Sequence, residues 1–298
     1  MRSRLDPTTL GLMAVGVLAV SLSGPVMASL VVPALAISFW RNGFATVAVA
    51  PFALSRARRE LRGLTRRQLG LILLSGGCLA AHFGFWVTSL TMTSVASSTA
   101  IVCLQIIWVV AWDRTQGIRL PGKAILGIAV AFIGAVVVSG VDFQASTRAL
   151  VGDVFALIGS IAIAGYSIIG GRARQSASTT AYTFVCYGTA AMVLLVAALV
   201  SGQQLVGYAP KQWLLILLVA ATAQLMGHSV FNYLLSTISP MVVSLALLLE
   251  IPGAALIAAA WLHQVPSVAA VGGLLLILLG MVLVVLNNRS TPEEAPMS

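Results

Sequence analysis

Long apolar stretches with almost no charge recur along the whole chain, separated by short segments that carry Arg, Gly or Pro. A helix needs about 20 predominantly apolar residues to cross the hydrocarbon core of a bilayer. Only 8% of the residues are charged, whereas soluble domains carry about 25%, so a soluble fold could not cover its surface. The sequence therefore predicts an all-α integral membrane protein.

The breaks in hydropathy divide the chain into ten candidate transmembrane helices. They cover residues 9–29, 33–54, 68–91, 94–112, 122–140, 150–170, 179–201, 212–235, 240–262 and 266–287. The turns after the first, third, eighth and ninth helices are very short, so we expect those neighbours to form antiparallel hairpins.

Lys and Arg are distributed unevenly over the segments between these helices. With the N-terminus in the cytoplasm, 14 of the 17 Lys and Arg residues fall in cytoplasmic segments, only Arg148 and Lys211 fall in outer segments, and Arg41 lies within the second helix. Cytoplasmic loops of membrane proteins carry such an excess. We therefore expect a multi-pass cell-membrane protein with both termini in the cytoplasm, and we attribute the net charge of +9 to topology rather than to nucleic-acid binding. The arginine run 56–67 is interpreted as a topology anchor that could also touch anionic lipid headgroups.

Other sequence features exclude several classes of function. Cys78, Cys103 and Cys186 lie in apolar runs at spacings that fit no metal site, so they are interpreted as small buried residues. The first apolar stretch lacks an A-x-A cleavage site, so no signal peptide is expected. The patterns H-E-x-x-H, G-x-S-x-G and G-x-x-x-x-G-K-[ST] do not occur, and we expect neither an enzyme nor a bound cofactor or metal.

The two halves of the chain resemble each other at an offset of about 145 residues. Leu104-Gln105-Ile106 aligns with Leu249-Glu250-Ile251, and His82 aligns with His228. The same alignment pairs glycines, Gly127 with Gly273 and Gly134 with Gly280. These glycines are best explained by close packing of helices.

This duplication predicts the domain organisation and a mode of action. We expect a first five-helix repeat in residues 1–147, a second in 148–287, and a polar, disordered cytoplasmic tail in 288–298. Because five is odd, the second repeat must start from the opposite side of the membrane. Inverted repeats of this kind recur in secondary transporters, where one half rocks against the other around a central site.

Several motifs in both halves are typical of one family. In the first half they are Ser21-Leu22-Ser23-Gly24-Pro25, Phe39-Trp40-Arg41-Asn42 and Thr93-Ser94-Val95-Ala96-Ser97-Ser98; in the second they are Ser236-Thr237-Ile238-Ser239-Pro240, Leu248-Leu249-Glu250-Ile251-Pro252-Gly253 and Gly273-x6-Gly280. With these motifs the chain resembles the drug/metabolite transporter superfamily, in particular its EamA-type members. It departs from the family at Gln264, where an acidic residue is frequent, and near Ile107, where a common proline is missing.

The resemblance implies a ten-helix carrier with cytoplasmic termini and a central cavity. Members of the family move amino acids, nucleobase-like compounds, drugs and other metabolites, and the bacterial members are mostly exporters. On this basis we expect a secondary-active transporter that exports small metabolites such as amino acids or amphipathic compounds. Its partners would be the substrate, membrane lipid and protons as the coupling ion, and it would act as a monomer or homodimer without nucleic acid.

Glu250 is the leading candidate for a functional side chain because it lies near the middle of the ninth helix. A charged residue at the bilayer centre costs about 2.5–3.5 kcal/mol on insertion scales. The carboxyl group should therefore face the bundle, be protonated, or pair with a cation such as a substrate amine. The alternative is a protonated Glu that only hydrogen-bonds a neighbouring helix. Pro252 removes a backbone donor two residues later and, with Gly24 and Pro25 in the first helix, is a candidate hinge.

Arg41 lies roughly 12 Å along the second helix, at 1.5 Å per residue. Its guanidinium group cannot easily lose its charge. It either binds a substrate carboxylate, pairs with an acidic group, or extends to the outer surface by snorkelling.

Two polar helix faces occur at matching positions of the repeats. His82 and Trp86 share a face of the third helix, and His228 and Asn232 share a face of the eighth. They are predicted to form opposing walls of a substrate cavity, although interhelical hydrogen bonding would also explain them. Two candidates complete the set. Gln105 is the neutral counterpart of Glu250, or a residue that joins helices, and Tyr166 is a ring that could stack on an aromatic ligand or simply pack.

Three functions compete on the sequence alone. A secondary transporter explains the intramembrane charges, the polar faces and the inverted duplication together. An intramembrane enzyme acting on lipid lacks the catalytic patterns described above. A passive channel would normally be an oligomer with a ring of polar residues, and we keep it as an alternative.

Overall fold

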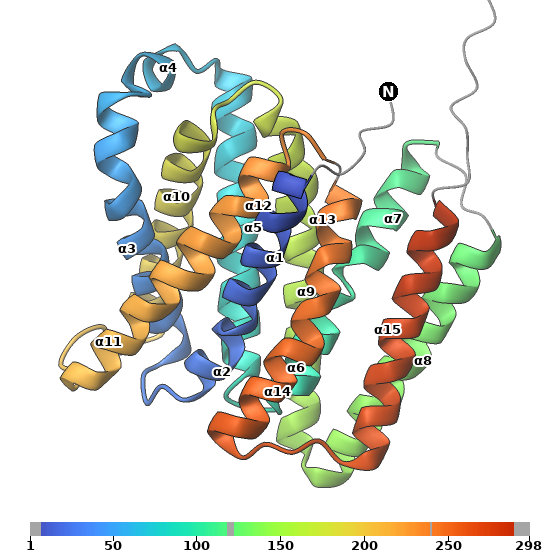
Figure 1. Cartoon of the computed structure of the whole chain (residues 1–298). Helices are drawn as coiled ribbons and strands as arrows, with labels where there is room; N and C mark the ends of the chain where they lie inside the picture. Colours follow the sequence, from blue (N-terminus) through green and yellow to red (C-terminus); the bar gives the residue numbers. More distant parts are fainter. Residues whose placement is uncertain (1–6, 118–121, 239, 289–298) are drawn as a thin grey trace, which may run out of the picture.

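The computed structural model describes residues 7–117, 122–238 and 240–288, and within these residues every regular element is a helix (Figure 1). Six membrane spans are single helices: α3 (Ala34–Ser55), α5 (Arg66–Ser89), α8 (Gly122–Ala145), α9 (Thr147–Arg174), α10 (Thr179–Val200) and α15 (Val268–Asn288). A short helix, α4 (Arg58–Gly63), connects α3 to α5 outside the spans.

The other four spans are interrupted. They are α1 (Pro7–Ser21) with α2 (Ser23–Ala28), α6 (Val95–Cys103) with α7 (Gln105–Thr115), α11 (Pro210–Val219) with η1 (Ala220–His228) and α12 (Ser229–Leu234), and α13 (Pro240–Ala246) with η2 (Leu247–Leu249) and α14 (Glu250–Leu262). The prediction of ten spans is therefore confirmed. Among the described residues seven spans are long and apolar enough to cross a membrane, and α8 and α15 contain shorter apolar segments, Ile125–Val137 and Val268–Gly280.

The two halves of the chain run through the bundle in opposite senses. Figure 1 shows α1 and α2 descending from the side where α15 ends, whereas α9, which opens the second half, ascends from the other side. Equivalent spans of the two halves pack directly on each other, α3 on α10, α6 on α14 and α8 on α15. The packing of α5 on α9 is matched by that of η1 on α1. These pairings are those of two five-helix repeats related by an in-plane two-fold axis.

Glycines make this symmetry visible between α8 and α15. A Cβ atom added to Gly134 would lie 2.7 Å from the carbonyl oxygen of Gly273, and one added to Gly280 would lie 2.5 Å from the carbonyl oxygen of Gly127. Because Gly127 and Gly134 are the repeat counterparts of Gly273 and Gly280, the two contacts are reciprocal, as a two-fold axis requires. Glycine at these positions allows the two backbones to approach closely.

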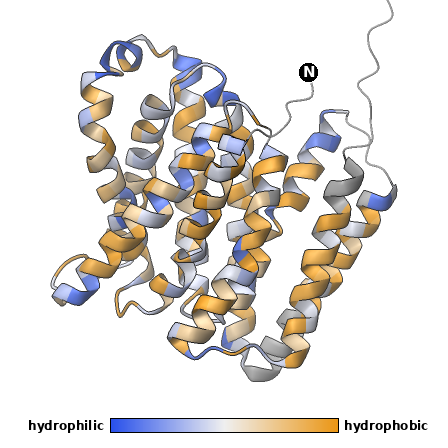
Figure 2. Cartoon of the chain, viewed as in Figure 1, coloured by the Kyte–Doolittle hydropathy of each residue, from blue (hydrophilic) through white to orange (hydrophobic). Residues whose placement is uncertain are grey.

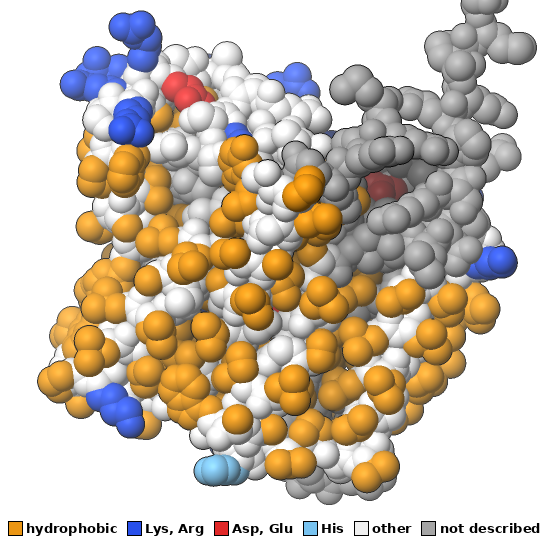
Figure 3. Space-filling model, in the orientation of Figure 1, with side chains coloured by type: hydrophobic (Ala, Val, Ile, Leu, Met, Phe, Trp, Pro, Cys, Tyr) orange, Lys and Arg blue, Asp and Glu red, His pale blue; other side chains and the backbone are white. Residues whose placement is uncertain are grey.

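The outer surface of the bundle is apolar along its length and basic at one end. Hydrophobic residues run along most of the length of the helices (Figure 2). Large apolar side chains such as Leu18, Val47 and Leu256 are exposed. In the space-filling view most Lys and Arg side chains gather beyond this apolar belt, above α3 and α5 (Figure 3). The chain thus has the surface of a protein whose flanks contact lipid rather than water.

The span boundaries agree with the predicted ones to within a few residues, except between α8 and α9. The sequence predicts an outer loop over 141–149, but α8 continues to Ala145 and α9 starts at Thr147. Ser146 makes the sharp junction possible, because its Oγ accepts a hydrogen bond of 3.0 Å from the backbone N–H of Ala149 and caps α9. The tail predicted for 288–298 lies outside the described residues from 289 onward.

Candidate functional site

A cavity lies in the middle of the bundle, between the two repeats. Its walls come from the first, third, fourth, sixth, eighth and ninth spans. Seven of the eight residues predicted to contact a substrate line it: His82, Trp86, Gln105, Tyr166, His228, Asn232 and Glu250. About 40 Å³ of the cavity is wide enough for water, and one water needs on the order of 10–15 Å³. In this conformation the cavity has room for a few waters only, and a metabolite could enter only after the walls move.

The first wall is a pair of rings on α5. His82 and Trp86 stack with ring centroids 5.3 Å apart and planes inclined by 18°, as expected for residues four apart on one helix face. The Nδ1 atom of His82 lies 3.1 Å from the carbonyl oxygen of Gly159 on α9. Since a carbonyl oxygen only accepts, Nδ1 carries the hydrogen and Nε2 is left without one in a neutral ring. The contact fixes the orientation of the imidazole.

A second part of the wall is a hydrogen-bonded network that joins α9, α10 and α12. The Tyr166 hydroxyl donates to Asn232 Oδ1 at 2.6 Å, and Asn232 Nδ2 donates to the Tyr187 hydroxyl at 3.2 Å. The ring of His228 packs edge-on against Tyr166 and Phe83, at centroid distances of 6.1 and 5.4 Å. The network holds this wall rigid by satisfying its buried polar groups with one another.

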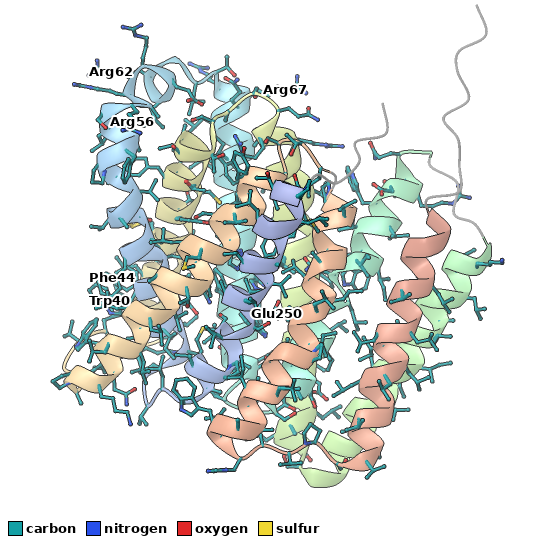
Figure 4. The ribbon with its side chains drawn as sticks, in the orientation of Figure 1. Trp40, Phe44, Arg56, Arg62, Arg67 and Glu250 are labelled. Carbon is teal, nitrogen blue, oxygen red and sulfur yellow. The ribbon has the colours of Figure 1, made fainter. Side chains whose placement is uncertain are left out.

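Glu250 closes the cavity at the first residue of α14. Its side chain is 8% exposed, and its carboxyl group forms no hydrogen bond or salt bridge with any described residue. In Figure 4 it lies about midway along the bundle. Its repeat counterpart Gln105 lines the same cavity, which the alignment of the two repeats predicted.

Two further polar atoms of the cavity walls lack partners. Gln105 Oε1 and Trp86 Nε1 are buried and make no hydrogen bond with the described residues. Buried polar atoms without a partner are rare and call for a ligand or water. An occupant of the cavity could therefore meet a free acceptor on Gln105, a free donor on Trp86 and the carboxyl group of Glu250.

Arg41 lies next to the cavity rather than on its wall. It is fully buried, so the snorkelling alternative is wrong. Its Nε donates to Gln224 Oε1 at 3.0 Å and its Nη1 to Ser23 Oγ at 3.2 Å, while its guanidinium carbon lies 4.0 Å from the ring centre of Phe83. Ser23 itself lines the cavity. Nη2 has no hydrogen-bond partner among the described residues, so its N–H groups are available to a further acceptor.

The fourth and ninth spans break at equivalent positions. Leu104 and Leu249 have ψ angles of −3° and −12°, far from the −42° of a regular α-helix. Each break immediately precedes a polar cavity residue, Gln105 or Glu250. The fourth span thus breaks without the proline that the family often has near Ile107. In the ninth span Pro252 contributes, because it has no N–H to donate to the carbonyl of Leu248.

The first span also breaks where hinge residues were expected. α1 ends at Ser21 and α2 starts at Ser23, so the interruption at Leu22 precedes Gly24 and Pro25. A Cβ atom on Gly24 would lie 3.2 Å from Val95 Cγ1 on α6, so glycine also permits close packing there. Movement at these positions stays a prediction.

Some residues of the site were missed in the sequence. In a regular α-helix Gln224 would share the stripe of His228 and Asn232, but η1 is a π-helix, and its wider turn directs Gln224 to Arg41 instead of the cavity. No sequence signal marks the π-helix. The sequence does not indicate Ser167 and Tyr187 as site residues either, because single hydroxyl groups in apolar helices are common and form no pattern.

Comparisons with known proteins identify a matching family by sequence and a similar fold by structure. The profile of the EamA-like transporter family matches residues 8–140 and again residues 150–286. No curated protein matches the chain. A solved structure described simply as "Crystal structure of protein" is similar over 96% of this chain and 99% of that chain, with a TM-score of 0.70 and 16% sequence identity. At this identity the similarity concerns the fold alone.

Proposed function

The chain belongs to the EamA-like transporter family, and from this premise we propose that it is a secondary-active carrier that exports small amphipathic metabolites, such as amino acids, by alternating access. It is a multi-pass membrane transporter, and since the family consists of transporters rather than enzymes, the enzymatic alternative is set aside. The substrate class, the direction and the coupling are the parts that we propose.

The observation that carries the proposal is the unpartnered carboxyl group of Glu250 in a cavity walled by aromatic rings. A carboxylate in a low-dielectric cavity attracts a cation strongly. An ammonium group of the substrate would supply that cation, and the stacked rings of His82 and Trp86 would pack against its apolar part. The free acceptor of Gln105 and the free donor of Trp86 would fix its orientation.

The position of Arg41 beside the cavity favours a substrate that also carries a negative charge. The contacts of Arg41 with Gln224, Ser23 and Phe83 include no anion, and Glu250 attracts it only through space. A buried cation without an anion in direct contact is costly. A substrate carboxylate that displaced Ser23 from Nη1 would pair with both Nη1 and the unused Nη2 donor. A zwitterion such as an amino acid therefore suits both Glu250 and Arg41.

The inverted repeats support alternating access. The reciprocal packing of α8 on α15 provides a symmetrical contact about which the halves could rock. The breaks before Gln105 and Glu250 provide flexible points at equivalent places in the two halves. Because the cavity admits only a few waters in this conformation, binding would be coupled to a change in its walls. Protons would compete with the substrate ammonium for Glu250, which is a simple basis for proton coupling.

The distribution of charge supports a cytoplasmic location for the end of the bundle that carries α4. Six arginines lie between Arg56 and Arg67 at this end, whereas Arg148 and Lys211 lie at the other. Both α1 and α15 have a terminus at the α4 end (Figure 1). Cytoplasmic substrate would then enter from this side and leave at the opposite one.

Flux in proteoliposomes tests the proposal. Vesicles loaded with an unlabelled amino acid should take up the labelled one by saturable counterflow, and an imposed proton gradient should change the rate. A flux that grows linearly with concentration and shows no counterflow would indicate a passive channel. A metabolite screen of cells that lack or overproduce the protein would select the amino acids to test.

A further inference from the structure

A second recess lies at the end of α3, separate from the cavity around Glu250. It is lined by Ser55, Arg56, Arg58, Arg59 and Arg62, has a volume of about 510 Å³ and is open to its surroundings. Figure 4 shows Arg56 and Arg62 at this end of the bundle, well above Glu250. The recess is formed where α3 turns into α4, so its position at one edge of the apolar belt is set by the fold.

The positive charge of the recess is not balanced by the side chains that line it. No carboxylate is among the lining residues of this described segment. The acidic residue of α4, Glu60, is engaged elsewhere, because its Oε1 accepts a hydrogen bond of 2.6 Å from the backbone N–H of Ser178 ahead of α10. Four guanidinium groups that face one recess repel one another unless an anion lies between them. Guanidinium groups bind phosphate oxygens in pairs, which makes phosphate the best-suited anion.

An apolar surface continues directly from the recess. On the outer side of α3, Val47, Phe52 and Leu54 are 69%, 53% and 57% exposed. The guanidinium carbon of Arg56 lies 5.9 Å from the ring centre of Phe52, so the basic and apolar surfaces meet there. Figure 2 shows the apolar part of α3 ending where the hydrophilic α4 begins.

We propose that this recess binds the phosphate headgroup of an anionic membrane lipid whose acyl chains lie along the exposed side of α3. A lipid satisfies both surfaces at once, because its phosphate meets the arginines while its chains cover Val47, Phe52 and Leu54. A nucleic acid or an acidic protein would engage the arginines only and would leave this apolar surface uncovered. Basic pockets beside membrane helices are suited to such headgroups.

The experiment compares two double variants of the full-length protein that remove equal charge from the same end. Arg58→Gln/Arg59→Gln alters the recess, whereas Arg66→Gln/Arg67→Gln alters the start of α5, which does not line it. Each protein is reconstituted in phosphatidylcholine vesicles with and without phosphatidylglycerol, extracted gently, and its retained lipids are counted by native mass spectrometry. Thermal unfolding in detergent checks that both variants are folded.

We expect the parent and the α5 variant to retain phosphatidylglycerol in preference to phosphatidylcholine, and the recess variant to lose this preference by about tenfold or more. Equal loss in both variants would mean general attraction to the basic end, and no loss in either would mean no site; both results would overturn the proposal. Glycerol 3-phosphate is added in a separate arm. Displacement of the retained lipid by this soluble phosphate at comparable concentration would show that a free phosphate, and not a lipid, is the ligand.

Discussion

Arg41 on α3 donates a hydrogen bond of 3.0 Å from its Nε to Oε1 of Gln224 on η1, and so joins the second span of one repeat to the eighth span of the other. Gln224 reaches Arg41 because the π-helix turns it away from the stripe of His228 and Asn232. The same amide donates from Nε2 to Asn42 Oδ1 at 3.2 Å. The hydrogen bonds that hold this buried cation come from neutral groups of the described residues, Glu250 attracts it through space, and its Nη2 atom keeps donors for a further anion.

Replacement of Arg41 separates function from stability. Arg41→Met removes a buried charge and fills much of the same volume, and Glu250, which attracts Arg41 through space, can be neutralised by protonation, so we expect only a small change in thermal stability. Transport should fall about tenfold or more, because the substrate carboxylate loses its partner. Thermal unfolding and proteoliposome flux measure the two effects. Reduced stability with unchanged flux would assign Arg41 a purely structural role.

The two histidines should be reachable from water in at least one conformation. In a background in which the three native cysteines are replaced by Ala, His82→Cys and His228→Cys should react with a small polar thiol reagent, and excess substrate should slow the reaction. Resistance of both cysteines to the reagent in every condition, in folded protein, would contradict a shared cavity.

The contact between α8 and α15 should tolerate no added side chain. Gly280→Ala places a Cβ atom 2.5 Å from the carbonyl oxygen of Gly127, so we expect a loss of about 1–3 kcal/mol in the free energy of unfolding. Gly272→Ala on the same helix is the matched control, because no atom lies within 4 Å of its added Cβ. Unfolding at increasing concentrations of a denaturing detergent would give the free energies of unfolding of the two variants. Equal stabilities would argue against the reciprocal packing.

Pro252 should matter for the rate of transport more than for binding. Pro252→Ala restores an N–H that can donate to the carbonyl of Leu248 and so favours a regular helix across the break. We expect a more stable protein that transports several-fold more slowly and binds substrate about as well. Binding by tryptophan fluorescence and flux in vesicles would be measured on the same preparation. Unchanged flux would show that this break is not a moving part.

Much of the fold could be predicted from the sequence because bilayer thickness sets the length of each apolar run. The alignment of Leu104–Ile106 with Leu249–Ile251 also predicted that Gln105 and Glu250 would lie at equivalent positions, and both line the cavity. The paired polar faces of α5 and α12 likewise indicated which helices meet there. Periodicity suffices to predict such features, because a polar face on a membrane helix almost always points to the interior of the bundle or to a cavity.

Three features could not be read from the pattern. The π-helix at Ala220–His228 changes which side chains share a face, and nothing in its composition distinguishes it from an α-helix. The break at Leu104 has no proline or glycine beside it that would mark it in the sequence. The junction at Ser146 was mistaken for a longer loop, because polar residues near the end of α8 resemble loop residues.

The most direct test of the account is counterflow of a labelled substrate by Glu250→Gln, with Gln105→Asn as a conservative change at the equivalent position. The account predicts that Glu250→Gln folds normally, loses about tenfold or more of the counterflow rate, and no longer responds to pH, while Gln105→Asn keeps its pH response. Counterflow by Glu250→Gln equal to that of the parent at several pH values would contradict the central claim that this carboxyl group binds the substrate or the coupling proton.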